Sequence, residues 1–239
     1  MTNKIYIDGV SSAAHQLFFD TLPIFPIAIE TVNTIKIPGR NNTLHQKTEE
    51  FQDLSVQLRA VHVGLNVDDI VSWISNGKKL EMDSVPGRFA LIKGATAYNP
   101  KRLGRGAIEF SLTIKIDPFK YDKASEAWNL DKLEYFAVPN KISVSGNYEA
   151  LPILLMSEVE SGTEITLNGV KVKITADVET LVFDVENKVV YQMLSDDTKI
   201  IAQNVTEGAF WEWKLFPGND NYIEMNKGII AMWKNERWL

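Results

Sequence analysis

The chain has 239 residues, of which 45% are hydrophobic and 23% charged, and this balance excludes an intrinsically disordered protein. The 31 acidic and 25 basic residues give a formal net charge of −6, and the basic residues do not cluster as a nucleic-acid-binding surface requires. The absence of cysteine excludes disulfide bonds, thiolate metal sites and cysteine nucleophiles.

The first residues, Met1 to Gly9, lack the apolar run of a secretory signal, and no segment has the uninterrupted apolar length needed to span a bilayer. The most apolar stretches, Leu22 to Ile29 and Leu151 to Met156, are short and interrupted by proline. They predict buried β-strands or extended segments, and we expect no contact with a membrane.

Short runs rich in Val, Ile, Thr and aromatic residues recur along the chain, separated by Gly, Pro, Asn or Asp, which is the pattern of β-strands. About thirteen such runs are too many for one small sheet, so the sequence predicts a mainly β fold of sandwiches or barrels. The predicted strands are Lys4 to Ile7, Val32 to Ile37, Phe51 to His62, Phe89 to Ala97, Ala107 to Ile116, Lys141 to Val144, Ile153 to Met156, Glu164 to Leu167, Val170 to Ile174, Thr180 to Asp184, Lys188 to Gln192, Gly208 to Phe216 and Ile229 to Trp233.

One segment, Asn66 to Ile74, has the spacing of a helix instead. Asp68 and Asp69 would lie near its positive N-terminus, and Gly77 is a plausible terminator. The sequence therefore predicts one helix, near residues 67–76, that packs against a sheet. The apolar face of this helix would consist of Val67, Ile70, Val71 and Ile74.

A domain boundary is predicted between Asp117 and Asn140, because a strand ends there at Pro118 and a charged, weakly periodic stretch follows. We expect an N-terminal β-sandwich or split-barrel domain at residues 1–130, which carries the helix, and a C-terminal β-sandwich at residues 131–239. No repeat of fixed period supports a solenoid or a propeller.

The three histidines, His15, His45 and His62, are irregularly spaced and match no metal-ligand motif. We expect surface or loop histidines with ordinary hydrogen bonds. The sequence accordingly predicts no metal ion and no cofactor.

Paired carboxylates occur at Glu49-Glu50, Asp68-Asp69 and Asp196-Asp197. A glycosidase needs two carboxylates across a cleft, one of them buried, and the sequence does not show that geometry. Asp68-Asp69 is better explained by the start of the helix, and Asp196-Asp197 by a turn between strands. No set of catalytic residues emerges, so an enzyme such as a cell-wall hydrolase is the weakest alternative.

Gly104-Arg105-Gly106 follows Lys101 and Arg102, a composition that suggests a phosphate-binding loop. No Gly-Lys-Ser/Thr follows, however, and the next element is a strand. We expect a basic hairpin tip in which glycine supplies the positive φ of a tight turn.

In the predicted strand from Gly208 to Phe216, alternation places Trp211, Trp213 and Leu215 on one face. Such a face is more often part of a core or interface, but an exposed aromatic platform would stack on sugars. The main alternative for the whole chain is therefore a carbohydrate-binding module that contacts cell-wall polysaccharide. Two tryptophans near the C-terminus, Trp233 and Trp238, would extend the same cluster.

Several motifs, read in order, resemble the distal tail protein (Dit) family of siphophages, the phages with long non-contractile tails. Ile37 to Leu44 is similar to that family's Pro-Gly-Arg-x-Gly-x-Leu turn, with Asn42 in place of the second glycine. Trp73-Ile74 is similar to the Trp-Leu pair of its helix. Gly106 to Phe110 and Asp117 to Tyr121 resemble the strand and the Pro-Phe-x-Tyr ending of its first domain.

The resemblance continues in the second half of the chain. Ser145 to Ile153 resembles the Asn-x-Gly-x-x-x-x-Pro start of the family's second sandwich, with the order of the polar residues altered. Thr180 to Asp184 and Phe216 to Asn221 resemble its later Asp-containing strand and its Leu-x-Pro-Gly-x-Asn turn. Each motif alone is common, and the specificity comes from their order along nearly the whole chain.

The resemblance implies a homo-oligomeric ring, hexameric in this family, at the tail tip of the virion, made from subunits synthesised in the cytoplasm of the bacterial host. The first domain would form the ring, and the second would be a galectin-like β-sandwich. The ring would join the tail tube protein to tail-associated lysin, baseplate and receptor-binding proteins, and DNA would pass through it without specific binding. The polar span from Gly39 to Glu50 is our candidate arm, because edge strands and hairpins can pair across subunits. No catalytic, cofactor-binding or metal-binding residue is predicted.

Overall fold

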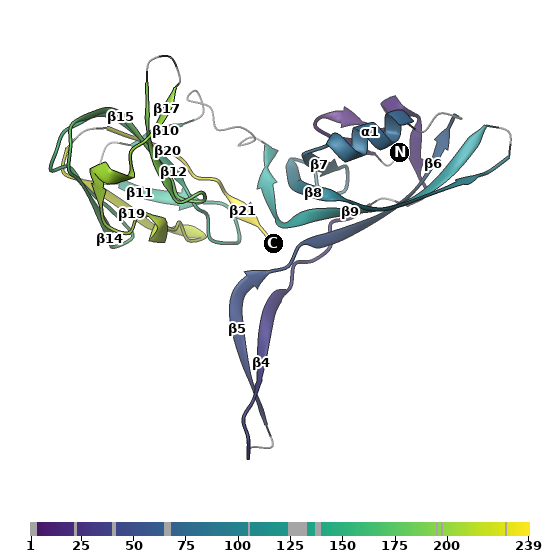
Figure 1. Cartoon of the computed structure of the whole chain (residues 1–239), viewed down its shortest axis with the longest axis horizontal. Coiled ribbons are helices and arrows are strands. Elements are labelled where there is room, and N and C mark those ends of the chain that lie inside the picture. Colours follow the sequence, from purple (N-terminus) through teal and green to yellow (C-terminus); the bar gives the residue numbers. More distant parts are fainter. Residues whose placement is uncertain are drawn as a thin grey trace. The chain divides into compact units, whose positions relative to one another are not determined.

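The computed structural model describes residues 4–21, 23–39, 42–64, 68–104, 106–123, 133–136, 140–194, 196, 198–227 and 229–239. The chain divides into two compact units, residues 1–123 with Leu239 (unit 1) and residues 124–238 (unit 2), and Figure 1 shows both. The boundary that the sequence predicts, between residues 130 and 131, lies outside the described residues. The predicted mainly β fold is confirmed.

Unit 1 is built on an antiparallel sheet in which β9 is the central strand. β6 follows one side of β9 without a break, from the pair Leu54↔Ile116 to the pair Val63↔Ala107. Apolar and polar residues alternate along β6, so that Val56, Leu58 and Ala60 enter the core. The strands follow the order β2 (Val10–Ser11), β1 (Ile5–Ile7), β7 (Lys79–Met82), β8 (Arg88–Arg102), β9 (Ala107–Asp122), β6 (Leu54–Val63) and β3 (Leu17–Phe19).

The predicted helix is confirmed as α1 (Asp68–Asn76), the one α-helix among the described residues. Ile70 and Ile74 are buried in the core of unit 1, and Trp73 packs against the same core. The prediction was wrong for Val71, which is exposed: it follows Ile70 by one position, about 100° around the helix, and so leaves the buried stripe. Val67 and Asn66 lie outside the described residues.

α1 ends where its last turn approaches β1. A Cβ at Gly77 would lie 2.2 Å from Ile7 Cγ2, so only glycine fits between the helix and the strand. After Gly77 the chain enters β7 (Lys79–Met82), a strand that the sequence did not predict.

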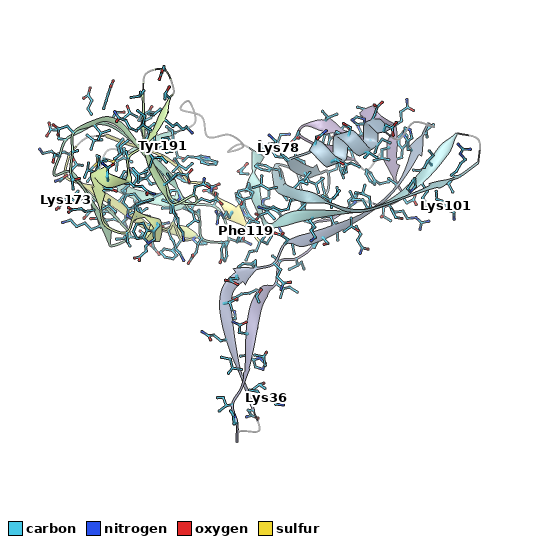
Figure 2. The ribbon with its side chains drawn as sticks, viewed as in Figure 1. Lys36, Lys78, Lys101, Phe119, Lys173 and Tyr191 are labelled. Carbon is cyan, nitrogen blue, oxygen red and sulfur yellow. The ribbon has the colours of Figure 1, made fainter. Side chains whose placement is uncertain are left out.

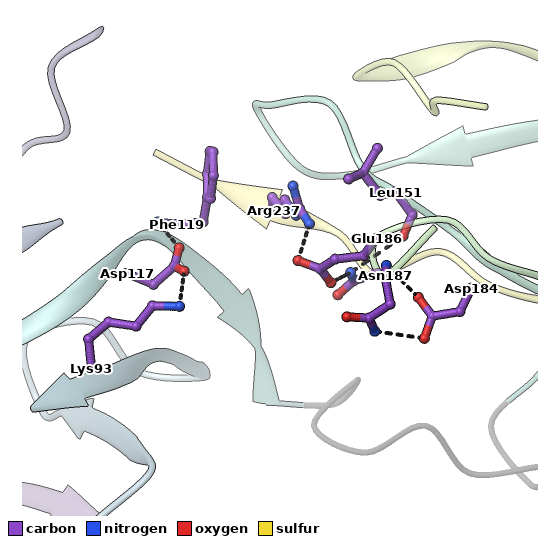
Figure 3. Close-up of polar contacts among 9 residues, drawn as sticks. Lys93, Asp117, Phe119, Leu151, Asp184, Glu186, Asn187 and Arg237 are labelled. Atoms are coloured by element: carbon purple, nitrogen blue, oxygen red, sulfur yellow. Dashed lines mark hydrogen bonds and ion pairs between the residues drawn. The ribbon is translucent and has the colours of Figure 1, made fainter. Parts of the chain in front are cut away.

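β9 does not end at Pro118 as predicted but continues to Asp122. The register of the β8–β9 pair shifts between the pairs Ala90↔Lys120 and Ile92↔Ile116, and this irregularity accommodates a proline inside the strand. Asp117 stabilises the irregularity, since its carboxylate accepts the backbone N–H of Phe119 at 3.0 Å and pairs with Lys93 Nζ at 3.1 Å (Figure 3).

A separate two-stranded hairpin of unit 1, here called the arm, consists of β4 (Glu30–Lys36) and β5 (Thr43–Phe51). In Figure 1 it extends away from the sheet of unit 1. β5 covers most of the span from Gly39 to Glu50 that the sequence predicts as a polar arm between two strands. That span is itself mostly strand, and β4 is its partner.

Unit 2 is a sandwich of two antiparallel sheets. Its main core lies between them and contains the largest fully buried side chains, Trp213 and Phe183. One sheet has the order β10 (Glu134–Phe136), β20 (Ile229–Trp233), β12 (Ile153–Val159), β15 (Val178–Asp184), β16 (Val189–Met193) and β17 (Lys199–Ile201). The other has the order β11 (Asn140–Val144), β19 (Gly218–Met225), β13 (Glu164–Leu167), β14 (Val170–Ile174) and β18 (Thr206–Glu207).

The six-stranded sheet is apolar on both faces. Leu154 and Met156 of β12 enter the main core, while Ile153 and Leu155 join a second cluster with Leu133. This explains why the stretch from Leu151 to Met156 is apolar without alternation, and the prediction of a buried strand there is confirmed. Among the described residues, no helix is long and apolar enough to cross a membrane.

A buried asparagine ties three segments of unit 2 together. Asn221 has 0% relative exposure. Its Oδ1 accepts the backbone N–H of Phe216 at 2.6 Å and Asn168 Nδ2 at 2.9 Å, and its Nδ2 donates to the carbonyls of Phe216 at 2.7 Å and Ile142 at 3.3 Å. Asn221, four residues after Pro217, therefore holds the turn before β19 against β11 and against the β13–β14 turn.

Replacement of Asn221 by alanine should destabilise unit 2 by about 2–4 kcal/mol, because buried donors and acceptors lose their partners. Denaturant unfolding, followed by tryptophan fluorescence, measures this. The matched control is Asn226→Ala. Asn226 is exposed and also bonds two backbone groups, Glu164 N–H at 2.9 Å and the Gly162 carbonyl at 3.3 Å. Water replaces those bonds, so we expect a loss of about 1 kcal/mol or less. Equal losses would contradict the role given to Asn221.

Candidate functional site

The described part of the arm has no hydrophobic core of its own. No side chain described in β4 or β5 is buried, and Val32 and Ile35 are exposed apolar residues. Figure 2 shows Lys36 near the end of the arm, with side chains on both sides directed away from the ribbon. Within the described chain β4 and β5 pair only with each other. The arm therefore offers both faces to a partner.

Polar contacts between its two strands maintain the arm. His45 lies opposite Thr34 and contacts two hydroxyls, Thr34 Oγ1 at 3.3 Å and Thr43 Oγ1 at 3.2 Å. Lys47 Nζ pairs with Glu30 Oε2 at 3.0 Å. These exposed contacts are individually weak, because water competes for each of them.

A second surface in unit 1 precedes the arm. Residues 23–29, here called the isoleucine segment, have no regular secondary structure. They are anchored by Phe25, which is buried in the core, and by Ser84 Oγ, which donates to the Pro23 carbonyl at 2.6 Å. Ile24, Ile27 and Ile29 are 70%, 82% and 77% exposed, so the burial that the sequence predicted here is wrong for these three isoleucines. Leu22 lies outside the described residues.

Two strands of unit 1 have backbone edges without a strand partner in the described chain. β7 pairs with β8 only through Phe89–Leu91, so residues 93–102 of β8 have β9 on one side and no strand on the other. β3 pairs with β6 only at Ala60–His62, which leaves residues 54–59 of β6 open in the same way. Such edges bind further strands unless they are covered.

The predicted basic hairpin tip joins β8 to β9. Leu103 N–H donates to the Ala107 carbonyl at 2.8 Å, and Gly104 has a φ of 75°, which confirms the turn. Lys101 and Arg102 precede the turn and are exposed, and Figure 2 shows Lys101 at this end of unit 1. Arg105 lies outside the described residues.

The sequence predicted surface or loop histidines, and this prediction is wrong for His62. His62 is buried in β6, and its Nδ1 lies 3.0 Å from the His15 carbonyl oxygen. The His15 ring stacks on Trp73 with a centroid distance of 4.6 Å. His45 is on the exposed arm. No group of three His, Cys, Asp or Glu side chains among the described residues is placed to hold a metal ion.

The acidic pairs have local roles. Asp68 and Asp69 begin α1, as predicted. Asp196 lies in the β16–β17 turn, where hydrogen bonds from the side chain and backbone of Thr198 lower the pKa of its carboxyl group. Asp197 lies outside the described residues, as does the side chain of Glu49, whose neighbour Glu50 is exposed on the arm.

The polar residues of the second-half motifs also have structural roles. Asp184 Oδ1 accepts the Asn187 N–H at 3.0 Å, which closes the turn between β15 and β16 (Figure 3). Nearby in unit 2, Glu186 accepts Arg237 Nη2 at 2.6 Å and Asn235 Nδ2 at 3.0 Å.

The predicted strand from Gly208 to Phe216 is wrong. Phe210–Glu212 forms a single 3-10 turn, η5, and this turn separates the aromatic side chains that strand alternation would have aligned. Trp213 and Leu215 are buried in the core of unit 2, and Trp213 Nε1 donates to the Val170 carbonyl at 2.9 Å. Trp211 is 48% exposed. Trp233 and Trp238 are not members of this main core.

Trp211 borders a cleft of about 460 Å³ on unit 2. Sequence reasoning missed it, because strand alternation grouped Trp211 with Trp213. The signal that could have separated them is Gly208-Ala209, a pair of small residues that marks a break before the aromatic run. The cleft is lined by Lys188, Gln203, Thr206, Gly208, Phe210 and Trp211.

No family model and no curated protein sequence matches the chain. Among solved structures, the chain is similar to the Dit protein (gp 19.1) of SPP1, with a TM-score of 0.71 and 12% sequence identity over 100% of both chains. That protein is described as a paradigm of the hub adsorption apparatus in phages that infect Gram-positive bacteria. The fold expected from the sequence motifs is therefore confirmed along the whole chain.

The Trp211 cleft depends on Gly208, whose φ is 117° and where a Cβ would lie 2.6 Å from the Lys171 carbonyl oxygen. Gly208→Ala should destabilise unit 2 by about 3 kcal/mol or more, because backbone strain and a steric clash add. Gly218→Ala is the matched control: its φ is 104°, but a Cβ there would have no atom within 4 Å, so strain alone should cost about 1–2 kcal/mol. Thermal and denaturant unfolding measure both, and a Gly208 loss no larger than the Gly218 loss would show that the close approach is unimportant.

Proposed function

We propose that the chain is a structural hub protein of a phage tail tip, where copies of it form a ring that connects the tail tube to tail-tip and receptor-binding proteins. The observation that carries the proposal is the fold shared with SPP1 Dit over 100% of both chains. The ring is hexameric in the family that the sequence motifs resemble, and we propose a ring of six copies for this chain as well.

The arm supports assembly on physical grounds. A two-stranded hairpin such as the arm, in which no described side chain is buried, is marginally stable in water, because little apolar area offsets the entropy of ordering it. Contact with another copy would supply the missing packing. A hairpin of one subunit that contacts a different surface of the next makes a heterologous interface, and such interfaces form a ring when the rotation between neighbouring copies closes.

The isoleucine segment supports the same conclusion through the hydrophobic effect. Burial of one isoleucine side chain contributes about 1.5–3 kcal/mol, so three highly exposed isoleucines represent several kcal/mol that assembly recovers. The open edges of β8 and β6 add backbone donors and acceptors to the same unit. We propose that unit 1 is the ring-forming domain, and that unit 2 is a galectin-like domain available to baseplate proteins.

The net charge of −6 is compatible with a ring through which DNA passes, because an acidic protein releases few counterions from phosphates and binds them weakly. We propose no specific binding of nucleic acid. Catalysis, a cofactor and a metal ion form no part of the proposal, which rests on likeness to a hub protein.

Light scattering and negative-stain images of the purified full chain test the proposal. We expect annular particles with a mass near six times the 27.0 kDa of the chain. The proposal would be refuted if the chain were found only as isolated protomers, both in concentrated samples and in the intact virion. Nanomolar affinity for duplex DNA at physiological salt would refute the proposal that DNA passes through the ring without specific binding.

Substitution of Ile24, Ile27 and Ile29 by serine should weaken ring formation by about a hundredfold or more, because each buried isoleucine contributes about 1.5–3 kcal/mol to association. Sedimentation velocity measures the loss, and circular dichroism should remain unchanged, since the side chains are exposed in the protomer. The matched control is Ile200→Ser with Ile201→Ser: these exposed isoleucines lie on β17 of unit 2. If both variants assembled like the unmodified chain, the isoleucine segment would not be part of the interface.

A further inference from the structure

We infer that the cleft beside Trp211 is a binding site for a single pyranose ring of a neutral polysaccharide. The inference goes beyond the hub function and depends on unit 2 alone. The site would be an additional property of a structural protein, and it assigns no activity to the rest of the chain.

Trp211 provides a fixed aromatic surface. Its neighbours Phe210 and Trp213 are buried, so the η5 turn is held by the core, while the indole of Trp211 remains 48% exposed. The Phe210 ring contacts this indole edge-on, with a centroid distance of 5.4 Å and an interplanar angle of 74°. A tryptophan held in this way loses little further conformational entropy when a flat ligand stacks on it.

The cleft has a suitable size and floor. Its volume of about 460 Å³ falls within the usual range of small-molecule sites, about 300–1,000 Å³. Gly208 has no side chain to fill it, and Phe210 forms an apolar base. Trp211 is thus part of a concave surface.

Polar groups surround the indole and are already oriented by the chain. Gln203 Nε2 donates to the Lys188 carbonyl at 2.9 Å, and Thr206 Oγ1 donates to the Gln203 carbonyl at 3.1 Å. These bonds leave the Gln203 amide oxygen, its second amide hydrogen and the lone pairs of the Thr206 hydroxyl without a partner in the described chain. The Lys188 ammonium likewise has no ion pair among the described residues.

This combination fits a sugar better than other ligands. A pyranose ring has an apolar C–H face that stacks on indole and an edge of hydroxyls that both donate and accept hydrogen bonds. No carboxylate lines the cleft, which disfavours a metal cation, and one exposed tryptophan offers too little apolar area for an amphipathic helix. In a ring of several copies, as proposed above, weak individual sites would act together.

Fluorine NMR of the full chain labelled with 5-fluorotryptophan tests the site, because the sequence contains 6 tryptophans and each gives one resonance. The probes are galactose, glucose, N-acetylglucosamine, N-acetylgalactosamine and rhamnose. We expect at least one sugar to shift the Trp211 resonance, assigned by its loss in Trp211→Phe, with a dissociation constant of about 1–10 mM. Absence of any shift for all five sugars would overturn the inference, whether or not the chain forms a ring.

Saturation-transfer difference NMR, which observes the sugar itself, measures binding by the variants. Trp211→Ala should weaken sugar binding about tenfold or more, and Gln203→Ala should weaken it while the Trp211 resonance and the circular dichroism remain in place. Tyr135→Ala is the matched control, because Tyr135 is an aromatic residue of unit 2 that is 68% exposed and does not line the cleft. Binding that survives Trp211→Ala, or that is lost equally in Tyr135→Ala, would place the sugar elsewhere and overturn the inference.

Discussion

Backbone groups at the edge of a β-sheet need hydrogen-bond partners, and the structure of unit 1 is governed by where its own chain supplies them. The centre of the sheet is satisfied on both sides, because β9 lies between β8 and β6. The backbone groups at the margins of the sheet lack strand partners, since β7 and β3 cover only short parts of β8 and β6. Water can satisfy these groups, but another strand satisfies them together with the apolar side chains beside them. Unit 1 is thus a stable core with margins suited to assembly.

Unit 2 also has edge strands, β10, β17, β11 and β18, but it encloses its main core within its own chain. Two sheets enclose a core, and a polar residue that enters the interior, Asn221, has several partners there. This difference agrees with the proposed roles, in which unit 1 forms the ring and unit 2 is available to baseplate proteins. A ring-forming domain needs unsatisfied surfaces of defined chemistry, whereas a domain that presents loops to other proteins needs a rigid support.

The sequence predicted what local periodicity determines. β13 and β14 have the predicted bounds, and α1 begins within one residue of its prediction, because apolar spacing and turn residues are strong there. The errors arise where the outcome depends on distant segments. Pro118 remains inside β9 because β8 accommodates the shift in register, and His62 is buried because its strand lies inside a sheet. Several strands, including β5, β10, β17 and β19, were not predicted because polar or glycine-containing sequences form them only when a partner strand is present.

The sequence predicted β4 as a strand and the span from Gly39 to Glu50 as a polar arm, but it missed the strand character of β5 and the Trp211 cleft. Both depend on geometry that a linear pattern does not contain: the pairing of β4 with β5, and a single 3-10 turn that rotates one tryptophan out of the core. The proposed hub function was predicted from the order of the motifs, and none of these motifs matches a catalytic or metal-binding pattern.

A hairpin that buries none of its described side chains is also under little selection from the folding of its own polypeptide. Residues such as Thr34, Ile35 and Gln46 can be exchanged during evolution at small cost to the protomer. Any restraint on them must come from the molecule they touch. If copies of the chain contact one another through the arm, as proposed, substitutions there would allow a subunit to distinguish its own copies from those of a related protein.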